Sequence, residues 1–445
     1  MKMAKTMLNR QCILLCVYAS FISFHSMAAD TLPQPLTLQA ALSYANNSDQ
    51  YQLQQADENV NKALAEAGQV VAVDDLSINL SGYLRKVGPS ELGDPDEDND
   101  SKVSLYVRKP LYDFGKSRAA YDQAQLKVEL RQLERDYLIE QRELSILQKY
   151  FDVLNADNDF LRHNENMAIG FISYDRAREN QELGLTSALE VLEKQSAYEV
   201  IRQNLYNSEN MQRLTRVMLA EELGFPDQPP SELSVPELEP ATQIKDEVDA
   251  IVEQAFRHSL LMQIRQKELA IAIQKMNSAT DTIGPHLDAE LEVSDYAREG
   301  STRDDWRASI YFEVPLYSGN REHSLVNIAT AEHRQALAAL QKTRSEIRIS
   351  VLKLWQAIKQ NSIRLAGEII NQEYRDMYLD KSRAEYELEF KTDLGDSMVQ
   401  FSTSRMQAYQ ARFALEMAWR KLEKLTGKEF LETMKIRQDA EVNNG

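Results

Sequence analysis

An internal repeat constrains the fold of this chain more than any other feature of its 445 residues. The segment Ser104–Tyr112 (SLYVRKPLY) matches Ser309–Tyr317 (SIYFEVPLY) at an offset of 205 residues. Upstream, Leu76–Leu80 matches Leu287–Leu291 at an offset of 211, and a longer loop in the first copy accounts for the difference. Self-similarity at a fixed spacing is the signature of a duplicated structural unit. The chain is therefore predicted to contain two copies of one unit.

The repeat sets the predicted boundaries of the parts of the chain. We assign residues 1–28 to a signal peptide, 29–224 to the first structural repeat, 225–243 to a proline-rich connector, 244–427 to the second repeat and 428–445 to a C-terminal tail. The signal peptide is predicted because a basic start precedes an apolar core and small residues near Ala28. Both cysteines, Cys12 and Cys16, lie in this segment, so the mature chain is expected to have no thiol for disulfides or metal ligation.

Proline positions indicate where long helices can form. Only 12 residues are proline, and four long tracts contain none: 36–88, 111–225, 241–284 and 316 onward. Because proline removes a backbone donor and clashes with the preceding turn, such tracts permit uninterrupted helices. Coiled-coil spacing predicts a long helix at about 115–181, and the repeat places its counterpart at about 321–386. Shorter helices, stacked in pairs beside the long ones, are expected at 36–72, 187–222, 244–281 and 393–426.

Each repeat also contains two segments in which apolar and polar residues alternate. The predicted strands lie at about 76–85, 103–110, 287–296 and 306–315. Alternation gives each strand one apolar and one polar face, and the length of these segments suits a tilted transmembrane strand. A half-buried sheet of a soluble protein is the alternative. The polar faces suit a water-filled lumen better, and the candidate lumen residues are Arg108, Asp288, Glu290, Glu292, Arg307 and Glu313.

Four strands cannot form a closed sheet in lipid, because the sheet edges would leave backbone N–H and C=O groups unpaired in hydrocarbon. The chain must therefore oligomerise to complete a barrel. Eight strands from a dimer would leave an interior filled by side chains, whereas twelve from a trimer would leave a passage. The turns from strand into long helix are predicted at Pro110, Tyr112, Pro315 and Tyr317.

Three features together resemble the TolC-like outer-membrane efflux proteins. They are the duplicated halves, the Pro-Leu-Tyr turns at Pro110 and Pro315, and the tip segment Leu183–Leu192 (LGLTSALEVL). The resemblance implies a mainly α fold with a transmembrane β-barrel, in which four strands per chain complete a twelve-stranded barrel in a homotrimer. A long periplasmic α-helical barrel would continue it.

The resemblance also implies a function. Such a protein is a passive channel of a tripartite efflux or type I secretion system, located in the cell outer membrane with a large periplasmic portion. Its partners would be a periplasmic adaptor (membrane fusion protein), an inner-membrane transporter and outer-membrane lipid. The sequence of such a channel indicates no particular cargo, because substrate specificity normally resides in the pump and adaptor.

Two sets of site residues follow from the resemblance. Family members close the periplasmic end with a ring of acidic residues, for which Asp393 and Asp396, with Lys391 nearby, are the candidates here. The alternative is that these aspartates only cap a helix that starts near Leu394. The candidate adaptor-docking residues are Leu183, Gly184, Leu185, Thr186 and Ser187 at the first tip, and Phe390 and Thr392 at the second. Helix capping alone would explain the hydroxyls of Thr186 and Ser187.

Charge and motif searches exclude other classes of function. The formal net charge of −18 makes nucleic acid an improbable partner. The sequence has no HExxH, Gly-x-Ser-x-Gly, P-loop or Gly-x-Gly-x-x-Gly pattern, so we expect no enzyme, no cofactor and no metal site. The competing interpretation is a soluble periplasmic coiled-coil scaffold or adaptor, whose long hairpins would look similar in sequence.

Overall fold

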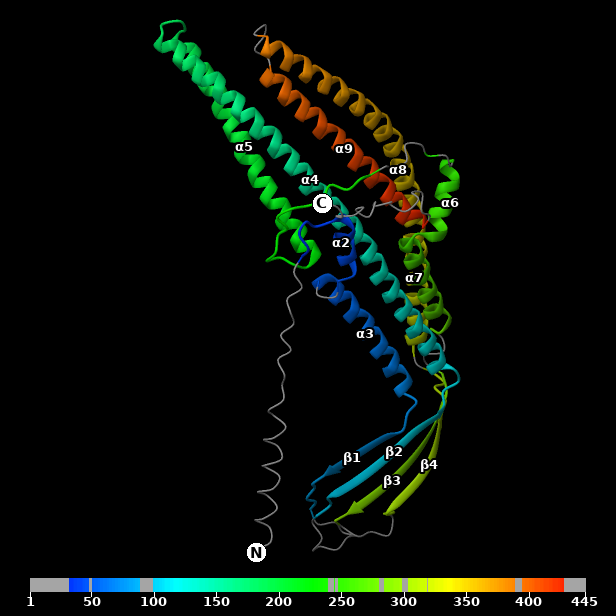
Figure 1. Cartoon of the computed structure of the whole chain (residues 1–445). Coiled ribbons are helices and arrows are strands. Elements are labelled where there is room, and N and C mark those ends of the chain that lie inside the picture. Colours follow the sequence, from blue (N-terminus) through cyan, green and yellow to red (C-terminus); the bar gives the residue numbers. More distant parts are fainter. Residues whose placement is uncertain are drawn as a thin grey trace, which may run out of the picture.

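The computed structural model describes residues 32–47, 50–88, 99–238, 244, 247–279, 284–297, 303–317, 319–388 and 394–427. The predicted signal peptide and C-terminal tail lie outside these ranges. The described chain is elongated, with one small sheet at one end and the ends of the helix pairs α4–α5 and α8–α9 at the other (Figure 1). The predicted fold class, mainly helical with a four-stranded antiparallel sheet, is confirmed.

Both repeats contain the same order of elements. The first comprises α2 (Leu38–Ser43), the short 3-10 helix η1 (Tyr44–Asn46), α3 (Tyr51–Ala72), β1 (Ser77–Tyr83), β2 (Lys102–Tyr112), α4 (Lys116–Glu182) and α5 (Ala188–Leu223). The second comprises α6 (Val248–His258), α7 (Leu260–Asn277), β3 (His286–Tyr296), β4 (Trp306–Glu313), α8 (Arg321–Glu387) and α9 (Leu394–Thr426). The long helices α4 and α8 have 67 residues each, or about 100 Å at 1.5 Å per residue.

Each long helix lies beside a column of shorter helices. In the first repeat, α4 packs against α5 toward the hairpin turn and against α3 toward the sheet. In the second repeat, α8 packs against α9 toward the turn and against α6 and α7 toward the sheet. The repeats join where α4 packs against α9 and α7 (Figure 1). The result is one curved helical layer that continues from the sheet.

The sheet is antiparallel with strand order β1-β2-β3-β4. The two hairpins join through β2 and β3, whose register pairs Tyr106 with Glu292. Among the described residues, β1 and β4 each pair on one side only, so both outer edges of the sheet are open.

None of the described helices has an apolar stretch of the length that a bilayer crossing requires.

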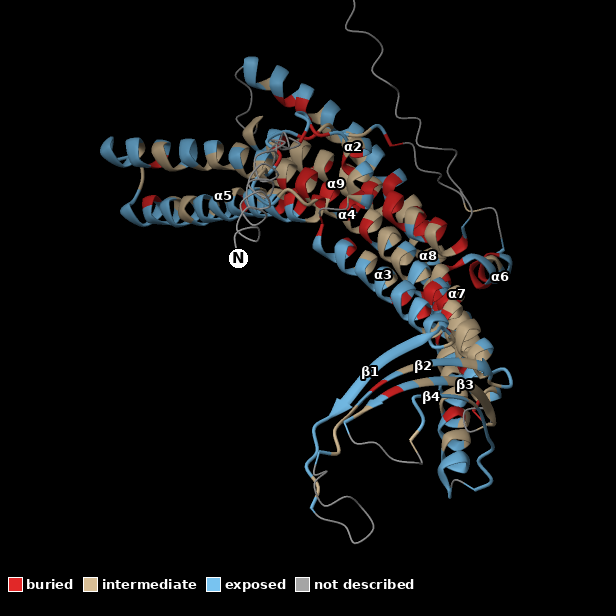
Figure 2. Cartoon of the chain, turned by 90° about the horizontal axis from the view of Figure 1, so that it is seen from below, coloured by how far each residue is buried: buried red, intermediate tan, exposed pale blue. Residues whose placement is uncertain are grey.

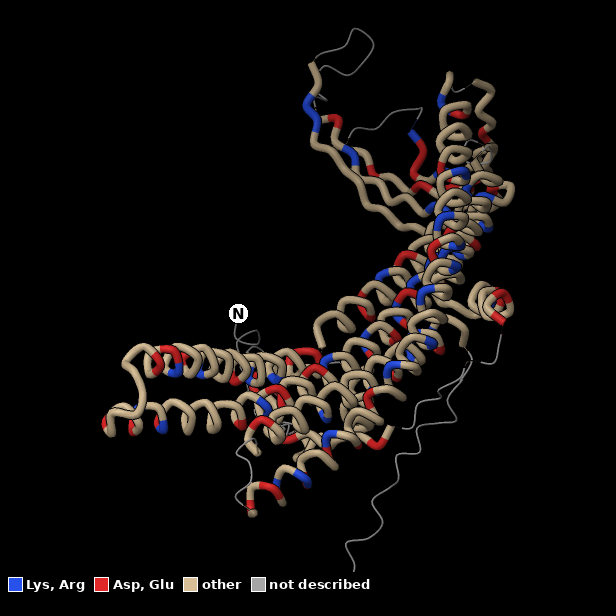
Figure 3. The backbone as a smooth tube through the Cα atoms, turned by 90° about the horizontal axis from the view of Figure 1, so that it is seen from above, with Lys and Arg blue, Asp and Glu red and all other residues tan. Residues whose placement is uncertain are grey.

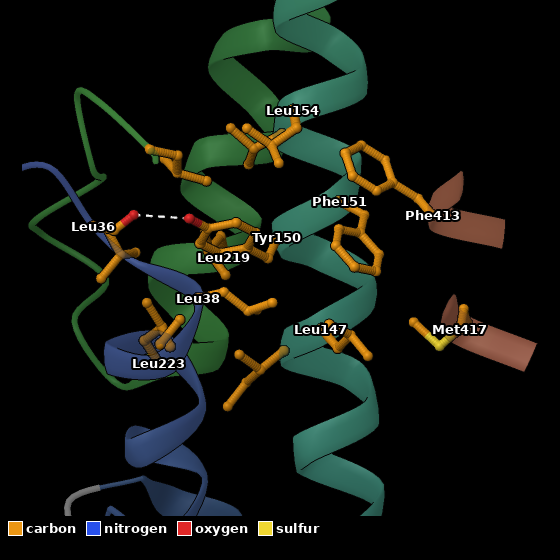
Figure 4. Packing of buried hydrophobic residues seen from close by; sticks show 14 of the residues in the cluster. Leu36, Leu38, Leu147, Tyr150, Phe151, Leu154, Leu219, Leu223, Phe413 and Met417 are labelled. Carbon is orange, nitrogen blue, oxygen red and sulfur yellow. Dashed lines mark hydrogen bonds between the residues drawn. The ribbon is translucent and has the colours of Figure 1, made fainter. Parts of the chain in front are cut away.

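The main apolar core lies midway along the helices, where buried residues gather (Figure 2). Tyr150 of α4 is fully buried there, and its hydroxyl lies 2.8 Å from the carbonyl oxygen of Leu36 and 2.6 Å from that of Ser234 (Figure 4). Phe151, the next residue, stacks on Phe413 of α9 with ring centroids 4.3 Å apart. Tyr150 therefore contacts the chain's first described segment and the connector. Phe151, beside it on α4, contacts the second repeat.

Two helices that the sequence predicts to be continuous are broken. The tract 36–72 is interrupted between η1 and α3, and the tract 244–281 is interrupted at Ser259. The glycine that follows the last helix of each repeat lies close to the break in that repeat. A Cβ on Gly224 would lie 3.2 Å from Nδ2 of Asn47, and a Cβ on Gly427 would lie 3.0 Å from Cβ of His258. The expectation of continuous helices was wrong because these breaks accommodate tertiary neighbours, and proline content does not report such contacts.

Candidate functional site

One face of the sheet carries most of the charged residues of β2, β3 and β4, whereas Lys109 and Asp295 lie on the other face. The register places Asn79, Tyr106, Glu292 and Arg307 in one row across the strands. The next row of this face contains Ser77, Arg108, Glu290 and Ser309. Because side chains alternate along a strand, Asp288 and Glu313 lie on the same face. All six candidate lumen residues therefore share one face of the sheet.

Hydrogen bonds link the charged residues of this face across the β2–β3 pair. Glu292 accepts from Nζ of Lys102 at 2.6 Å and from the hydroxyl of Tyr106 at 3.2 Å. Ser294 donates to the same carboxylate at 2.8 Å, and its Oγ also lies 2.8 Å from that of Ser104. Lys102 and Tyr106 belong to β2 of the first repeat, and Glu292 belongs to β3 of the second. These contacts therefore join the two β-hairpins.

The remaining charges of this face are distributed toward its two ends. Arg108 binds Glu290 at 2.5 Å, whereas Arg307 contacts Asp304, outside the strands, at 3.3 Å. Toward the helices, Nε2 of His286 lies 3.8 Å from Asp288 and 3.6 Å from Glu313. Figure 3 shows acidic and basic residues interspersed along the described chain rather than separated into patches.

The opposite face of the sheet is apolar and exposed in the single chain. Its exposed side chains come from all four strands and include Ile78, Leu80, Val103, Leu105, Leu291, Val293, Trp306, Ile310 and Phe312. A contiguous apolar surface of this kind marks contact with a membrane or with another protein. The two faces of the sheet therefore suit two different surroundings.

The predicted strand-to-helix turns differ in structure between the repeats. In the first, the β2–β3 register shifts between Pro110 and Tyr112, and the ring of Tyr112 packs edge-on against Phe114 at 4.7 Å. In the second, Pro315 and Tyr317 follow the end of β4 and are exposed. The sequences of these turns are alike, but the contacts of their tyrosines are not.

The turn between α4 and α5 is closed by backbone hydrogen bonds. Gly184 has φ +72°, and its N–H donates to the carbonyl of Gln181 at 2.9 Å. The N–H of Leu185 donates to Asn180 at 2.8 Å, which completes a Schellman motif. The side chains of Leu183 and Leu185 are left exposed at the end of the hairpin.

The two hydroxyls at this first tip have different hydrogen-bond partners. Ser187 is the N-cap of α5, where its Oγ accepts from the backbone N–H of Glu190 at 3.2 Å. Thr186 donates to the side chain of Glu190. Capping therefore accounts for the hydroxyl of Ser187 alone, and it does not account for the exposed leucines.

At the second tip, Phe390, Lys391, Thr392 and Asp393 lie outside the described residues. Asp396 is exposed in the first turn of α9.

Asp396 is linked to the neighbouring long helix through a glutamine that sequence reasoning missed. Its carboxylate accepts from the amide of Gln400, whose oxygen accepts from Arg375 of α8. The spacing of Asp396 and Gln400, one turn apart on a helix, is the only sequence signal for this contact. Gly395 lies against α4, because a Cβ there would be 3.0 Å from the side chain of Ile169. The start of α9 is thus placed by both long helices.

Comparisons with known proteins agree with this geometry. Residues 42–224 match the sequence model of the outer membrane efflux protein family. No curated protein sequence matches the chain.

Several solved structures share the fold over most of its length. CusC, described in connection with transmembrane channel formation, has a TM-score of 0.70 at 14% identity, covering 89% of this chain and 93% of that one. The outer membrane protein VceC of Vibrio cholerae has 0.68 at 16% identity, covering 88% and 97%. The CmeC outer membrane channel of Campylobacter jejuni has 0.69 at 14% identity, covering 88% and 85%.

The chain thus resembles outer-membrane efflux proteins in the sequence of one segment and in its fold. The match to the outer membrane efflux protein family lies in residues 42–224, within the first repeat. The second repeat completes the fold shared with the solved channels.

Proposed function

We propose that this chain is one protomer of a homotrimeric outer-membrane channel. The observation that carries the proposal is the open four-stranded sheet, in which β1 and β4 are both unpaired on their outer sides within the described chain. Pairing β4 of one copy with β1 of the next satisfies these edges, and three copies supply twelve strands. A barrel of this size has room for a passage.

The two faces of the sheet fit the two sides of such a barrel. The apolar face, with Leu80, Ile310 and Phe312, would contact lipid. The polar face, with its Lys102–Glu292 and Arg108–Glu290 pairs, would line the aqueous lumen. If the sheet had the reverse orientation, its ion pairs would lie in hydrocarbon. Each polar group left unpaired there would cost several kcal/mol.

The helical layer would extend the channel into the periplasm. The predicted signal peptide would bring the chain there, and α4 and α8 would span about 100 Å from the membrane. The hairpin turns would then meet a periplasmic adaptor and an inner-membrane transporter, with Leu183 and Leu185 in the docking surface. Cargo would pass through the trimer without chemical change, as in tripartite efflux or type I secretion.

The second tip would form the periplasmic gate. Three copies of Asp393 and Asp396 would ring the axis, and their mutual repulsion favours bound cations. The link from Asp396 through Gln400 to Arg375 supports this role, because it would hold the start of α9 to α8 in a closed state.

Membrane fractionation of a Gram-negative host that expresses the full chain tests the proposal. We expect the protein in the outer membrane as a trimer that resists heat in detergent, and we expect purified trimer to conduct ions across planar bilayers. Release of the chain by osmotic shock, as a monomer without channel activity, would instead support a soluble periplasmic scaffold.

A further inference from the structure

Parts of the helical layer are covered by short segments of the chain. α6 stands off one side of the layer, and its Phe256 lies beside the guanidinium groups of Arg344 and Arg348 of α8 (Figure 2). Trp419 of α9 is buried in the same apolar cluster as α6. On α4, the hydroxyl of Tyr150 binds the connector. Trp419 and Tyr150 therefore mark the directions in which α9 and α4 are covered.

A cavity of about 340 Å³ lies on the opposite face of the layer, where α4, α8 and α9 line it. Its lining includes Gln148 of α4 and Lys421 of α9. Gln148 lies two residues before Tyr150, and Lys421 lies two residues after Trp419. Residues two apart in a helix point about 200° apart, so the cavity faces away from both the connector and α6. Its volume is in the range of small-molecule pockets, which begins at about 300 Å³.

The face that holds the cavity would be the inner face of the proposed channel. The wall of a tube must keep one face clear for cargo, whereas α6 and the connector add bulk to the other face. Phe151 of the lining lies 35 residues after the first residue of α4 and 31 before the last, or roughly 50 Å from either end. Three copies of the cavity would therefore ring the passage at mid-height of the helices.

The floor of the cavity is apolar. Phe151 of α4 and Phe413 of α9 stack with ring centroids 4.3 Å apart, and Met417 follows Phe413 by one turn (Figure 4). Ala414 and Ala418 leave space beside these larger side chains. Aromatic rings and thioethers make favourable contacts with other aromatic groups. The floor therefore suits a ligand that carries an aromatic ring.

Amide side chains from all three helices surround this floor, namely Gln148, Asn155, Asn361 and Gln410. Oδ1 of Asn155 is buried without a hydrogen-bond partner among the described residues. The amide nitrogen of Gln148 donates to Asp152 at 2.8 Å, which leaves its oxygen to act as an acceptor. A buried polar atom without a partner costs free energy, so a ligand that donates a hydrogen bond here gains affinity.

Lys421 decides which charge the cavity favours. It is exposed, and it is the only charged residue among the described residues that line the cavity. Lys424 of the same helix binds Glu143, whereas Lys421 has no ion pair within the described part of the chain. Lys421 lies one turn beyond Met417 of the floor, so one small molecule can contact the floor with an aromatic ring and the ammonium with an anionic group.

We propose that this cavity is a cargo-binding site for aromatic molecules that carry a carboxylate or sulfonate group. The aromatic ring lies over Phe413 and Met417, the anionic group binds Lys421, and the amides bind the remaining polar groups of the cargo. The site holds cargo midway along the helices, between the tips and the barrel. This inference rests on the proposed channel and specifies a class of cargo for it.

Protection of a cysteine placed in the cavity tests the assignment in the purified full chain. The mature sequence is predicted to have no cysteine, so Ala414→Cys adds one thiol per chain. We expect 2-naphthalenesulfonate to slow its modification by N-ethylmaleimide, about ten-fold at about ten times the half-protecting concentration. Gln410→Cys, one turn away in the lining, should be protected as well. The matched control is Thr403→Cys, which points the same way as residue 414 but lies about 16 Å along α9 and should stay unprotected.

Analogues of different charge test the class of ligand. Neutral 2-naphthol and the cation 2-naphthylmethylammonium should protect less well than 2-naphthalenesulfonate. Lys421→Glu should weaken binding of the sulfonate about five-fold and strengthen binding of the cation, a reversal that misfolding would not produce. Lys342→Glu is the control, since Lys342 is exposed on α8 outside the cavity, where it pairs with Glu346. It should change neither affinity.

The outcomes separate this site from the proposed function. Conducting trimers in which millimolar probe protects neither residue 414 nor residue 410, or protects residue 403 equally, would overturn the site and leave the channel intact. Equal protection by the anion and the cation, unchanged in Lys421→Glu, would overturn the assigned class of cargo. Protection at residue 414 in a monomer that does not conduct would contradict the channel while leaving the binding site in place.

Discussion

The buried guanidinium of Arg142 donates a hydrogen bond to Oε1 of Gln50 over 3.2 Å, from a position on α4 that is only 1% exposed. It also donates to the carbonyl oxygens of Glu222 at 3.0 Å and Tyr44 at 3.4 Å. The carbonyl of Glu222 lies in the last turn of α5, where backbone acceptors lack helical partners, whereas that of Tyr44 also accepts from the N–H of Asn47 at 3.0 Å. Arg142 therefore joins three segments at the break before α3.

Replacing Arg142 with leucine should destabilise the protein by about 1–3 kcal/mol, because the variant removes the side-chain donor to the part-buried carbonyl oxygen of Glu222. The midpoint of thermal unfolding of the purified protein checks this. Arg131→Leu is the control, since Arg131 is half-exposed and pairs with Glu134 on the same helix. Its loss should change stability by about 0.5 kcal/mol or less. Equal effects of the two substitutions would contradict the role assigned to Arg142.

Leu185→Glu should abolish efflux while leaving trimer assembly intact. The side chain of Leu185 is exposed at the first tip, so a charge there costs little folding stability but would oppose an apolar docking surface. Susceptibility of cells to exported compounds measures efflux, and gel mobility measures assembly. Ile172→Glu, at an exposed apolar position of α4 away from the tip, should leave efflux near normal. Normal efflux in Leu185→Glu would remove this residue from the docking surface.

Replacing both Asp393 and Asp396 with alanine should raise single-channel conductance and weaken block by divalent cations, because the variant removes the proposed ring of negative charge. Planar-bilayer recordings give both quantities. Asp380→Ala is a control on α8 near the same tip, where Asp380 binds Arg383 at 3.2 Å. If the double variant conducts like the wild type, these aspartates only cap α9.

Lys102→Met should shift the ion selectivity of the channel toward cations, since Glu292 would lose its lysine partner in the proposed lumen. Glu292→Gln should shift it toward anions. The double variant should return close to the wild type, because the paired charges cancel. Reversal potentials under a KCl gradient measure these shifts, and three unchanged values would place this pair outside the conducting pathway.

Glu416 should make stability depend on pH. Burial raises the pKa of this carboxyl above its ordinary 4.5, although the nearby Arg420 acts in the opposite direction. The folded state then holds the proton more tightly than the unfolded state, so stability falls as pH rises from 4.5 through the raised value. Glu416→Gln should flatten this fall, as followed by thermal unfolding between acidic and neutral pH. A steeper fall in the variant would contradict the assigned direction.

The sequence predicted the elements more readily than their contacts. Strong alternation around Glu290 and Glu292 predicts both strands and faces, because it is a local pattern with period two. The link from Asp396 through Gln400 to Arg375 was missed, because its members come from two helices whose relative height depends on packing.

The repeat gives a clear case of this difference. At the offset of 205 residues, buried Arg142 of the first copy corresponds to Ile347 of the second, which lies in an apolar cluster. Two positions that are equivalent in the repeat therefore hold a buried charged residue in one copy and a buried apolar residue in the other. Nothing in the local sequence distinguishes them, since both lie in uninterrupted helix.

The sequence by itself determined that this chain has a mainly helical fold with a small sheet of two-faced strands, because periodicity and proline placement act locally. Tertiary structure alone decided where α2 and α3, and α6 and α7, separate, because Gly224 and Gly427 approach those breaks from distant parts of the chain.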